Sequence, residues 1–283
     1  MGELILCATP IGNLEDITLR VLRTLKEVDL IAAEDTRNTI KLLNHFDIKT
    51  PMTSYHEHNK MEKGPYLINK MLEGMKIALV TDAGTPAISD PGEDLVALCY
   101  ENNIPVTSLP GAVACVTALT LSGLPTRRFA FEAFLPADKK ERKRVLEELS
   151  QEYRTIILYE APHRMEKTLS QLLEYLGDRQ VSLVRELTKK HETVHRSSLA
   201  ELLAWVQNEG VKGECVLVIR GKDLEAETAR QEEEWKSMDL KEHMEIYEKQ
   251  GLDRKNAMKR VAKDRGVSKR EIYQELLQLE EEL

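Results

Sequence analysis

Short apolar runs alternate with helix-spaced segments along roughly the first 120 residues of the chain. Continuous apolar runs are typical of strands that are buried on both faces of a parallel sheet. The predicted strands lie at residues 4–8, 30–33, 52–55, 76–80 and 106–109. Helices are predicted between them. In the first, residues 17–28, the side chains of Leu19, Leu22, Leu25 and Val28 share one face, and Asn59 with Glu62 fits a capping pattern for the helix that ends near Gly74. The alternation predicts an α/β fold with a mainly parallel sheet.

The pattern changes after Ser122-Gly123-Leu124-Pro125, a stretch that we interpret as a linker. Longer, more alternating strands follow at residues 129–134, 155–159, 181–186, 193–196 and 214–220. Helices are expected between them at about residues 138–149, 164–176 and 198–209, and Ser198 with Glu201 has the spacing of a capping box. This half predicts a second α/β domain with a mixed sheet.

The last part of the chain is charged and helical, and Ser268 with Glu271 can cap its final helix. Residues 251–270 carry eight Lys or Arg side chains against two Asp, a local charge of +6 that follows a Glu-rich stretch. Such a basic helical segment can contact a phosphate backbone, and Lys255, Lys259 and Arg260 are the predicted contacts. The predicted domains are therefore residues 1–121, residues 122–222, and a small helical C-terminal unit at 223–283.

Loops rich in Gly and Pro follow at least three of the predicted strands. The longest, residues 81–92, contains two Gly, two Pro and two Asp, and shorter ones lie at 9–13 and 110–112. Ligands of open α/β sheets bind beyond the carboxyl ends of the strands, and Gly allows close backbone approach there. The sequence predicts a cleft along this edge, suited to a zwitterionic or neutral cofactor.

Composition and motifs exclude several classes of function. A net charge of -8 argues against wholesale nucleic-acid binding, although local basic surface remains possible. No apolar run approaches the ~18 residues of a membrane helix, and no signal peptide is recognised, so we expect a cytoplasmic protein. The four Cys lack CxxC spacing and are expected to be buried thiols, and no metal site is predicted. The phosphate loop GxxxxGK[ST] and the dinucleotide motif GxGxxG are absent, so kinases and nicotinamide-dependent enzymes lack their signatures here. The GxSxG motif is absent as well.

A series of sequence blocks carries a specific resemblance. They include ATPIGNLEDIT at residues 8–18, AEDTR at 33–37, SYHEHN at 54–59, DAGTPAISDPG at 82–92, YEAPHR at 159–164, RELTK at 185–189 and Gly213-Glu214. Together they resemble the tetrapyrrole methylase superfamily, and most closely its branch of 2′-O-methyltransferases that act on a cytidine of small-subunit ribosomal RNA. The blocks occur in order over about residues 4–220.

The resemblance implies a fold, a cofactor and an activity. The expected fold has two α/β domains of the class III methyltransferase type with a cleft between them, which would bind S-adenosyl-L-methionine. The expected reaction is 2′-O-methylation of a cytidine ribose in 16S ribosomal RNA. The expected partners are that RNA or the small ribosomal subunit, and a second copy of the chain in a homodimer.

Site residues are carried over onto the matching blocks. The implied cofactor residues are Asp82, Gly84, Pro86, Ile88, Gly111, Ala112, Tyr159 and Gly213. A ribose hydroxyl needs a proton acceptor, and the candidates are Glu186, His163 and Asp35. Arg37, Arg164 and Arg185 could bind RNA phosphates.

Each assignment has a structural alternative. Asp82 could cap its own loop, and Tyr159 could be a core aromatic residue. Glu186 could form an interdomain ion pair with Arg185 or Arg164. Two other functions also stay open, a precorrin-type tetrapyrrole C-methyltransferase and a catalytically silent RNA-binding assembly factor.

Overall fold

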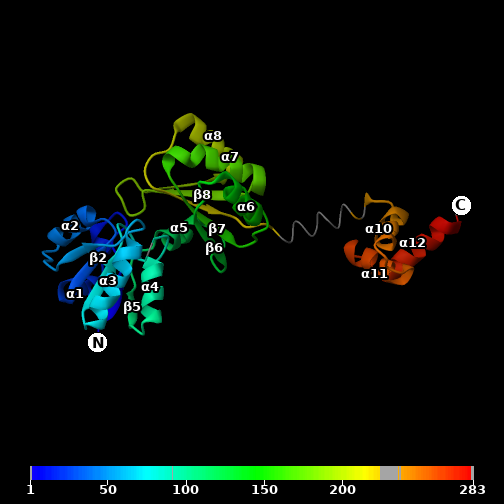
Figure 1. The fold of residues 1–283 in the computed structure, drawn as a ribbon. Coiled ribbons are helices and arrows are strands. Elements are labelled where there is room, and N and C mark those ends of the chain that lie inside the picture. The colour runs from blue at the N-terminus through cyan, green and yellow to red at the C-terminus, as the bar shows by residue number, and fades with distance from the viewer. Residues whose placement is uncertain (1, 91, 224–234, 236, 282–283) are drawn as a thin grey trace. The chain divides into compact units, whose positions relative to one another are not determined.

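The computed structural model describes residues 2–90, 92–223, 235 and 237–281. The chain divides into two compact units, which we call the core unit, Met1–Gly221, and the C-terminal unit, Lys222–Leu283 (Figure 1). Pro91 and most of the Glu-rich stretch, residues 224–234, lie outside the described residues. Within the described part of the chain, no helix is long and apolar enough to span a membrane.

The first sheet of the core unit has five parallel strands in the order β3-β2-β4-β1-β5. Its strands are β1 (Glu3–Cys7), β2 (Leu30–Ala33), β3 (Met52–Ser54), β4 (Lys76–Val80) and β5 (Val106–Leu109). The connecting helices are α1 (Leu19–Glu27), α2 (Thr36–His45), α3 (Lys60–Leu72) and α4 (Gly92–Glu101). A short 3-10 turn, η1 (Leu14–Asp16), precedes α1. The strand positions and parallel pairing agree with the sequence prediction.

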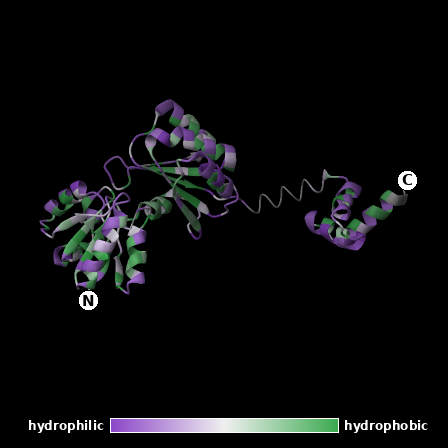
Figure 2. Cartoon of the chain, in the orientation of Figure 1, coloured by the Kyte–Doolittle hydropathy of each residue, from purple (hydrophilic) through white to green (hydrophobic). Residues whose placement is uncertain are grey.

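Both faces of this sheet are buried, which explains its continuous apolar runs. Leu4 and Leu6 of β1 pack with side chains of α3 and α4, among them Leu67 and Leu95. Ile5 and Cys7 point to the opposite face and pack with residues of α1 and α2. The sheet therefore forms the middle of three layers, and Figure 2 shows its hydrophobic strands between more hydrophilic helices.

The second sheet is mixed, in the order β6-β7-β10-β8-β9. Only β6 and β7 pair in parallel, and the other neighbours are antiparallel. Its strands are β6 (Phe129–Phe134), β7 (Thr155–Glu160), β8 (Gln180–Arg185), β9 (Thr193–Ser198) and β10 (Cys215–Ile219). Helices α6 (Lys139–Ser150), α7 (Met165–Leu176) and α8 (Leu199–Glu209) share one hydrophobic core with it, and a 3-10 turn, η2 (Pro162–Arg164), precedes α7. The predicted mixed sheet is confirmed.

One helix joins the two sheets into a single unit. Helix α5 (Ala114–Ser122) follows β5 of the first sheet, and its residues Cys115, Ala118 and Leu119 pack against the second sheet. Ile11, from the loop after β1, belongs to the same cluster. The carboxyl edge of the first sheet is thereby held against the second sheet.

Two local predictions were wrong. Leu19 is 85% exposed because it begins α1 instead of facing the sheet with Leu25. Asn59 lies at the start of α3, but its side chain does not cap the helix. Its Oδ1 accepts from the His56 N–H at 2.8 Å, and its Nδ2 donates to Ser54 Oγ at 3.0 Å, which stabilises the preceding loop instead.

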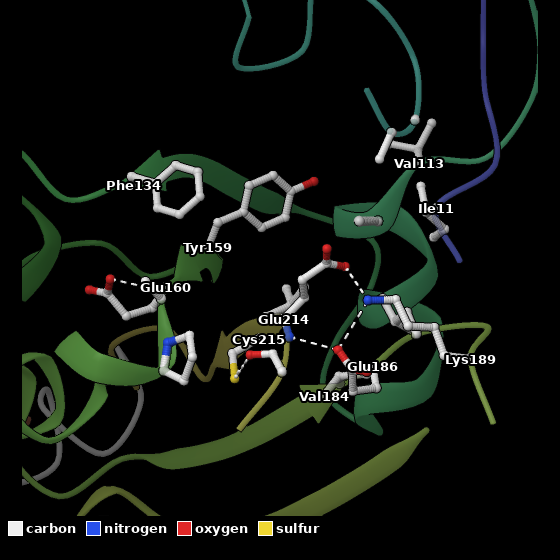
Figure 3. Close-up of a pocket in the computed structure, with 18 of the residues that line it drawn as sticks. Ile11, Val113, Phe134, Tyr159, Glu160, Val184, Glu186, Lys189, Glu214 and Cys215 are labelled. Carbon is white, nitrogen blue, oxygen red and sulfur yellow. Dashed lines mark hydrogen bonds and ion pairs between the residues drawn. The ribbon is translucent and has the colours of Figure 1, made fainter. Parts of the chain in front are cut away.

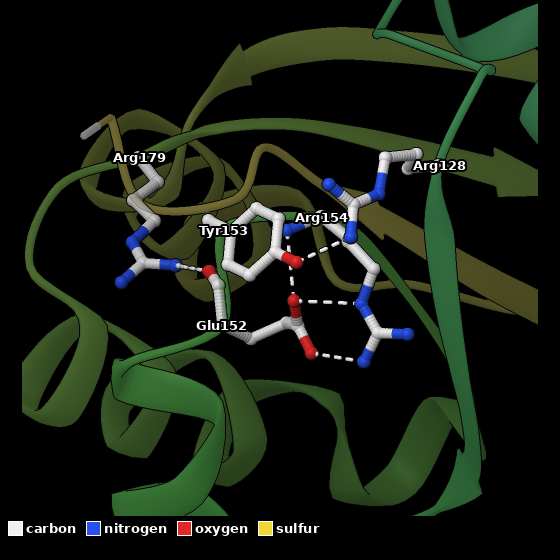
Figure 4. A network of polar contacts seen from close by, with 5 residues as sticks. All are labelled: Arg128, Glu152, Tyr153, Arg154 and Arg179. Atoms are coloured by element: carbon white, nitrogen blue, oxygen red, sulfur yellow. Dashed lines mark hydrogen bonds and ion pairs between the residues drawn. The ribbon is translucent and has the colours of Figure 1, made fainter. Parts of the chain in front are cut away.

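A polar network lies just before the first residue of β7. Glu160 is the last residue of this strand and lies at its other end. Arg154 donates to both carboxylate oxygens of Glu152, and Arg128 stacks over the Tyr153 ring with 4.8 Å between its guanidinium carbon and the ring centroid (Figure 4). Arg179 donates to the Glu152 carbonyl oxygen. Through Arg179, the network connects the loop before β7 to the ends of α6 and α7.

The described residues of the C-terminal unit contain three helices, α10 (Leu240–Lys249), α11 (Arg254–Asp264) and α12 (Lys269–Glu281). They enclose a small apolar core that includes Met244, Val261 and Ile272. The predicted Ser268/Glu271 capping pair is present: the Ser268 N–H donates to the Glu271 carboxylate, and the Glu271 N–H donates to the Ser268 hydroxyl oxygen. The predicted basic residues Lys255, Lys259 and Arg260 are exposed on α11.

Candidate functional site

The core unit contains a cavity of about 640 Å³ that is lined by residues of both sheets (Figure 3). We call it the first cavity. The loops after β1, β4 and β5 supply one part of its wall, and the ends of β7, β8 and β10 supply the other. Its size lies within the usual range for a small-molecule or cofactor site, roughly 300–1,000 Å³.

Hydrogen bonds between the loops of the first sheet shape one wall. Thr9 and Gly84 exchange backbone hydrogen bonds of 2.9 and 3.1 Å, which pair the loop after β1 with the loop after β4. The Thr85 hydroxyl donates to the Ala112 carbonyl oxygen at 3.0 Å and fixes the loop after β5. A Cβ on Gly111 would come within 2.5 Å of the Ala8 Cβ, so this close approach requires glycine. The three Gly/Pro-rich loops therefore form one connected wall.

An aromatic group from the second sheet forms the apolar side of the cavity. Tyr159 and Phe134 contact each other edge to face with their ring centroids 5.6 Å apart. The Tyr159 hydroxyl accepts from the Cys115 N–H at 3.0 Å, and burial raises the pKa of this phenol well above its usual value. Burial also raises the pKa of the Cys215 thiol to about 11. Both groups are neutral at physiological pH and offer packing surface, not charge.

A set of three charged side chains forms the opposite side (Figure 3). Lys189 Nζ lies 3.1 Å from Glu186 Oε1 and 3.0 Å from Glu214 Oε2. Glu186 Oε1 also accepts from the Glu214 N–H at 2.8 Å. This backbone bond, followed by the Lys189 hydrogen bond, lowers the pKa of Glu186. Partial burial opposes the charge of Lys189, but its bonds to the two carboxylates raise its pKa. The rim is thus ionised and mixed in charge.

The loop that presents these charges is conformationally unusual. Glu186 and Thr188 both have positive φ angles, of 50° and 63°. Gly213 has a φ of 83°, and a Cβ there would lie 2.5 Å from the Glu186 carboxylate. Backbone strain of this kind costs on the order of 1–3 kcal/mol and is concentrated at functional sites. The geometry places the Glu186 carboxylate directly against the backbone at Gly213.

The structure brings together half of the predicted cofactor residues. Gly84, Ile88, Tyr159 and Gly213 all line the first cavity. Pro86, Gly111 and Ala112 lie outside its lining, and the last two support the loop wall from behind. Asp82 lies elsewhere: it lines a second cavity, and its Oδ2 accepts from Asn38 Nδ2 at 3.1 Å. Asp82 therefore does not line the first cavity.

The three candidate proton acceptors are in different surroundings. Glu186 lines the first cavity, whereas His163 is exposed in η2 beside Pro162, which does line it. Asp35 caps α2, and its bidentate hydrogen bonds from Arg37 lower the pKa of the carboxyl group to about 2. Asp35 is thus committed to a local ion pair.

The arginines predicted to bind RNA are also engaged within the protein. Arg37 binds Asp35, and Arg164 lies 3.2 Å from the buried carboxylate of Glu160. The Arg185 guanidinium lies 5.9 Å from the Trp205 ring centroid. The structural alternative, an ion pair of Glu186 with Arg185 or Arg164, is not formed among the described residues, because Glu186 pairs with Lys189.

Sequence reasoning assigned no role to several residues that line the first cavity. Phe134 ends β6. Lys189 and Glu214 lie within the matching blocks, but their side-chain directions depend on how the loops fold together. For Lys189 a signal existed, since it stands three residues after Glu186 in a stretch that ends a strand.

The comparison with known protein families decides the classification. A sequence model of the tetrapyrrole (corrin/porphyrin) methylases matches residues 3–203. The chain belongs to the tetrapyrrole methylase family. The resemblance expected from the sequence blocks is confirmed, and so is the predicted fold class.

Individual relatives refine this position. The chain is 52% identical over 272 residues to "Ribosomal RNA small subunit methyltransferase I" of Halalkalibacterium halodurans, covering 96% of this chain and 93% of the relative. It is 48% identical over 273 residues to the protein of that name from Bacillus subtilis, with the same coverage. The chain is accordingly an enzyme of the methyltransferase class.

Solved structures of the family share its fold. One is a uroporphyrin-III C-methyl transferase from Thermus thermophilus complexed with S-adenyl homocysteine. It matches with a TM-score of 0.55 and 19% identity, covering 77% of this chain and 97% of that structure.

Proposed function

We propose that this tetrapyrrole methylase family member transfers the methyl group of S-adenosyl-L-methionine to the ribose 2′-oxygen of a cytidine in small-subunit ribosomal RNA. The observation that carries the proposal is the match of 52% identity over nearly the whole chain to a relative named for ribosomal RNA small subunit methylation. The tetrapyrrole alternative is less well supported, because the uroporphyrin enzyme is only 19% identical.

The residues around the first cavity fit the proposed cofactor. Its apolar side, with Phe134, Tyr159 and Val216, suits an adenosine, and its charged rim suits an amino acid moiety. Glu214 would accept from the ammonium group, and Lys189 would pair with the carboxylate. When bound, the cofactor supplies an electrophilic methyl group on a sulfonium. Gly84 and Gly213 would let backbone groups approach it closely.

Among the candidate proton acceptors we place Glu186 first. It lines the first cavity, and its lowered pKa keeps it ionised at neutral pH. A carboxylate with a low pKa is a weak base, so alignment of the hydroxyl with the methyl group would supply much of the rate enhancement. His163 is the second candidate, because it is exposed, follows Pro162 of the cavity lining, and has no committed partner among the described residues. Asp35 is third.

RNA recognition is proposed for the basic surfaces. Lys255, Lys259 and Arg260 on α11 are exposed, and none has a carboxylate within ion-pair distance among the described residues. Arg185 has no carboxylate within ion-pair distance among the described residues, whereas Arg37 and Arg164 would have to exchange a carboxylate for a phosphate. We also propose the division at residues 1–121, 122–222 and 223–283, a homodimer, and a cytoplasmic location.

The decisive experiment uses labelled S-adenosyl-L-methionine with purified 16S RNA, small ribosomal subunits and a uroporphyrinogen as separate acceptors. We expect transfer to one of the two RNA acceptors and none to the tetrapyrrole. Alkaline hydrolysis checks the position, because a 2′-O-methyl group protects the adjacent phosphodiester bond. Label on the tetrapyrrole alone, or RNA binding without any transfer, would support one of the two alternative functions.

A further inference from the structure

A second cavity, of about 300 Å³, lies on the other side of the loops that line the first. The loop after β1 contributes Thr9 and Pro10 to the second cavity, whereas Ile11 lines the first. The loop after β4 contributes Thr81 and Asp82 to the second cavity, whereas Ala83 and Gly84 line the first. The Thr9–Gly84 backbone pair therefore lies between two cavities that have no lining residue in common.

Helix α2 supplies the outer wall of the second cavity. Asn38, Lys41 and His45 recur at helical spacing and all line it. The Lys41 and His45 side chains are exposed, and among the described residues neither has a carboxylate within 4.0 Å. Asn38 donates one hydrogen bond to Asp82 and retains a carbonyl oxygen and a second N–H. The helix therefore turns uncommitted polar groups and positive charge toward this space.

The lining combines three kinds of chemistry in a small volume. Pro10, Leu14 and Leu42 are apolar, and Leu14 is 41% exposed. Asn38 and Asp82 offer a donor and acceptor pair, Lys41 offers positive charge, and His45 offers a further polar ring. A bare phosphate would meet the Asp82 carboxylate, and a divalent cation would meet Lys41. A nucleotide has an apolar base, hydrogen-bonding edges and hydroxyls, and a phosphate, so it satisfies all three.

We propose that the second cavity is a nucleotide subsite for the RNA strand that carries the methyl acceptor, an inference that rests on the proposed function. Asp82 and Asn38 bind the hydrogen-bonding groups of the ribose or base, Leu14 contacts the base, and Lys41 with His45 contacts a phosphate. Asp82 thereby belongs to RNA recognition, although its loop also forms the wall of the cofactor cavity. The paired loops separate the two binding sites.

The test compares Asn38→Ala, Lys41→Ala and Asp82→Asn with the parental protein. Lys26→Ala is the matched control, since Lys26 is an exposed lysine at the end of α1, away from the cavity and without an ion pair among the described residues. We expect each cavity variant to raise the KM for RNA about 5- to 10-fold. Calorimetric affinity for S-adenosyl-L-methionine and the melting temperature should match the parental values, as should both RNA and cofactor binding of Lys26→Ala.

Two results would overturn the inference. One is a loss of cofactor affinity in folded Asp82→Asn, which would return Asp82 to the cofactor site. The other is RNA binding by Asn38→Ala and Lys41→Ala that equals that of the Lys26→Ala control. Equilibrium RNA binding without turnover gives the same comparison if the parental protein transfers no methyl group to RNA. In that case the proposed function fails while the subsite is still tested.

Discussion

Glu186 is the residue on which the local geometry of the site converges. Its positive φ, its contact with Gly213 and its bonds from Lys189 and the Glu214 N–H all fix one carboxylate at the rim of the first cavity. The same bonds favour the ionised form, so the charge is present throughout the physiological pH range. A group held in this way is preorganised to accept a proton or to orient a hydroxyl.

We expect Glu186→Gln to lower the rate of methyl transfer by ~10²-fold while cofactor affinity changes less, because the acceptor is lost but the shape is kept. In the parental enzyme, a lowered pKa predicts that the rate stays flat until the pH falls below about 4.3, the ordinary glutamate value. Single-turnover rates across pH measure both effects. His163→Ala is the companion variant, and near-parental rates in both would assign the proton to another acceptor.

Site residues could be predicted from the sequence only where the backbone fixes them. Gly84 and Gly213 lie near the ends of strands and both have positive φ angles, a conformation that glycine adopts readily and that the residue type therefore indicates. The direction of a side chain in an irregular loop follows no repeating pattern, so the sequence does not predict it. Asp82 and Gly84 are two residues apart, yet they line different cavities because the loop pairs with Thr9 between them.

At the scale of elements, the contact between two loops controls the shape of the first cavity. A Cβ on Gly12 would come within 2.7 Å of the Leu187 carbonyl oxygen and 2.5 Å of Lys189 Cγ. The loop after β1 thus packs without a gap on the loop after β8, and neither backbone can give way freely. The fold of one loop sets the position of the charges on the other.

Gly12→Ala should therefore separate these loops and weaken cofactor binding, by about 1–3 kcal/mol, the usual cost of overpacking. Calorimetric titration with S-adenosyl-L-methionine measures the change. Gly210→Ala is the control: Gly210 ends α8 with a φ of 69° and has no atom near its missing Cβ. That substitution should reduce stability through backbone strain and leave the cofactor affinity unchanged. Equal cofactor affinities in the two variants would show that the loop contact has no such role.

The network before β7 makes a prediction about stability (Figure 4). The Arg154 side chain, by its hydrogen bonds and charge, lowers the pKa of Glu152 to about 2, below the unfolded value of about 4.3. A lowered folded-state pKa means that the stabilisation is complete above about pH 5 and is lost as the pH falls toward 2. Glu152→Gln should thus reduce the free energy of unfolding at pH 7 by about 1 kcal/mol, with a smaller reduction at pH 3 and little difference at pH 2 or below.

Chemical denaturation at several pH values measures this difference. The control is Glu73→Gln, because Glu73 forms a surface pair with Lys70 and its side chain is 62% exposed. Such a pair contributes little, about 0–0.5 kcal/mol. A Glu152 effect that is independent of pH would mean that packing, not the charge, stabilises the loop.

Elements were predictable where a periodic signal or a capping pair determines them. Ser198 with Glu201 forms the expected capping box of α8, and the buried runs of the first sheet became parallel strands. The prediction that Leu19 shares the buried face was wrong, because its place at the start of α1, and not the helical period, decides how exposed its side chain is. The packing of α5 on the second sheet was also outside the prediction, since an apolar helix carries no information about which of two sheets it contacts.

At the scale of the whole molecule, the basic surface of α11 and the first cavity belong to different compact units of the chain. The C-terminal unit has its own apolar core and presents Lys255, Lys259 and Arg260 on α11, while the chain as a whole carries a net charge of -8. The first cavity is lined by residues of the core unit alone. Cofactor binding and this basic surface can therefore be separated by mutation.

We expect deletion of residues 240–283 to leave cofactor affinity intact, to weaken RNA binding and to flatten its dependence on salt. The triple variant Lys255→Ala, Lys259→Ala, Arg260→Ala keeps the unit and its buried core, so it isolates the charges from the fold. If each side chain neutralises one phosphate, the slope of log affinity against log salt should fall by about 2 to 3. Filter binding over a range of salt concentrations measures the slope. A triple variant with the parental slope, together with a truncated chain that methylates normally, would make the unit a structural or dimer-supporting appendage.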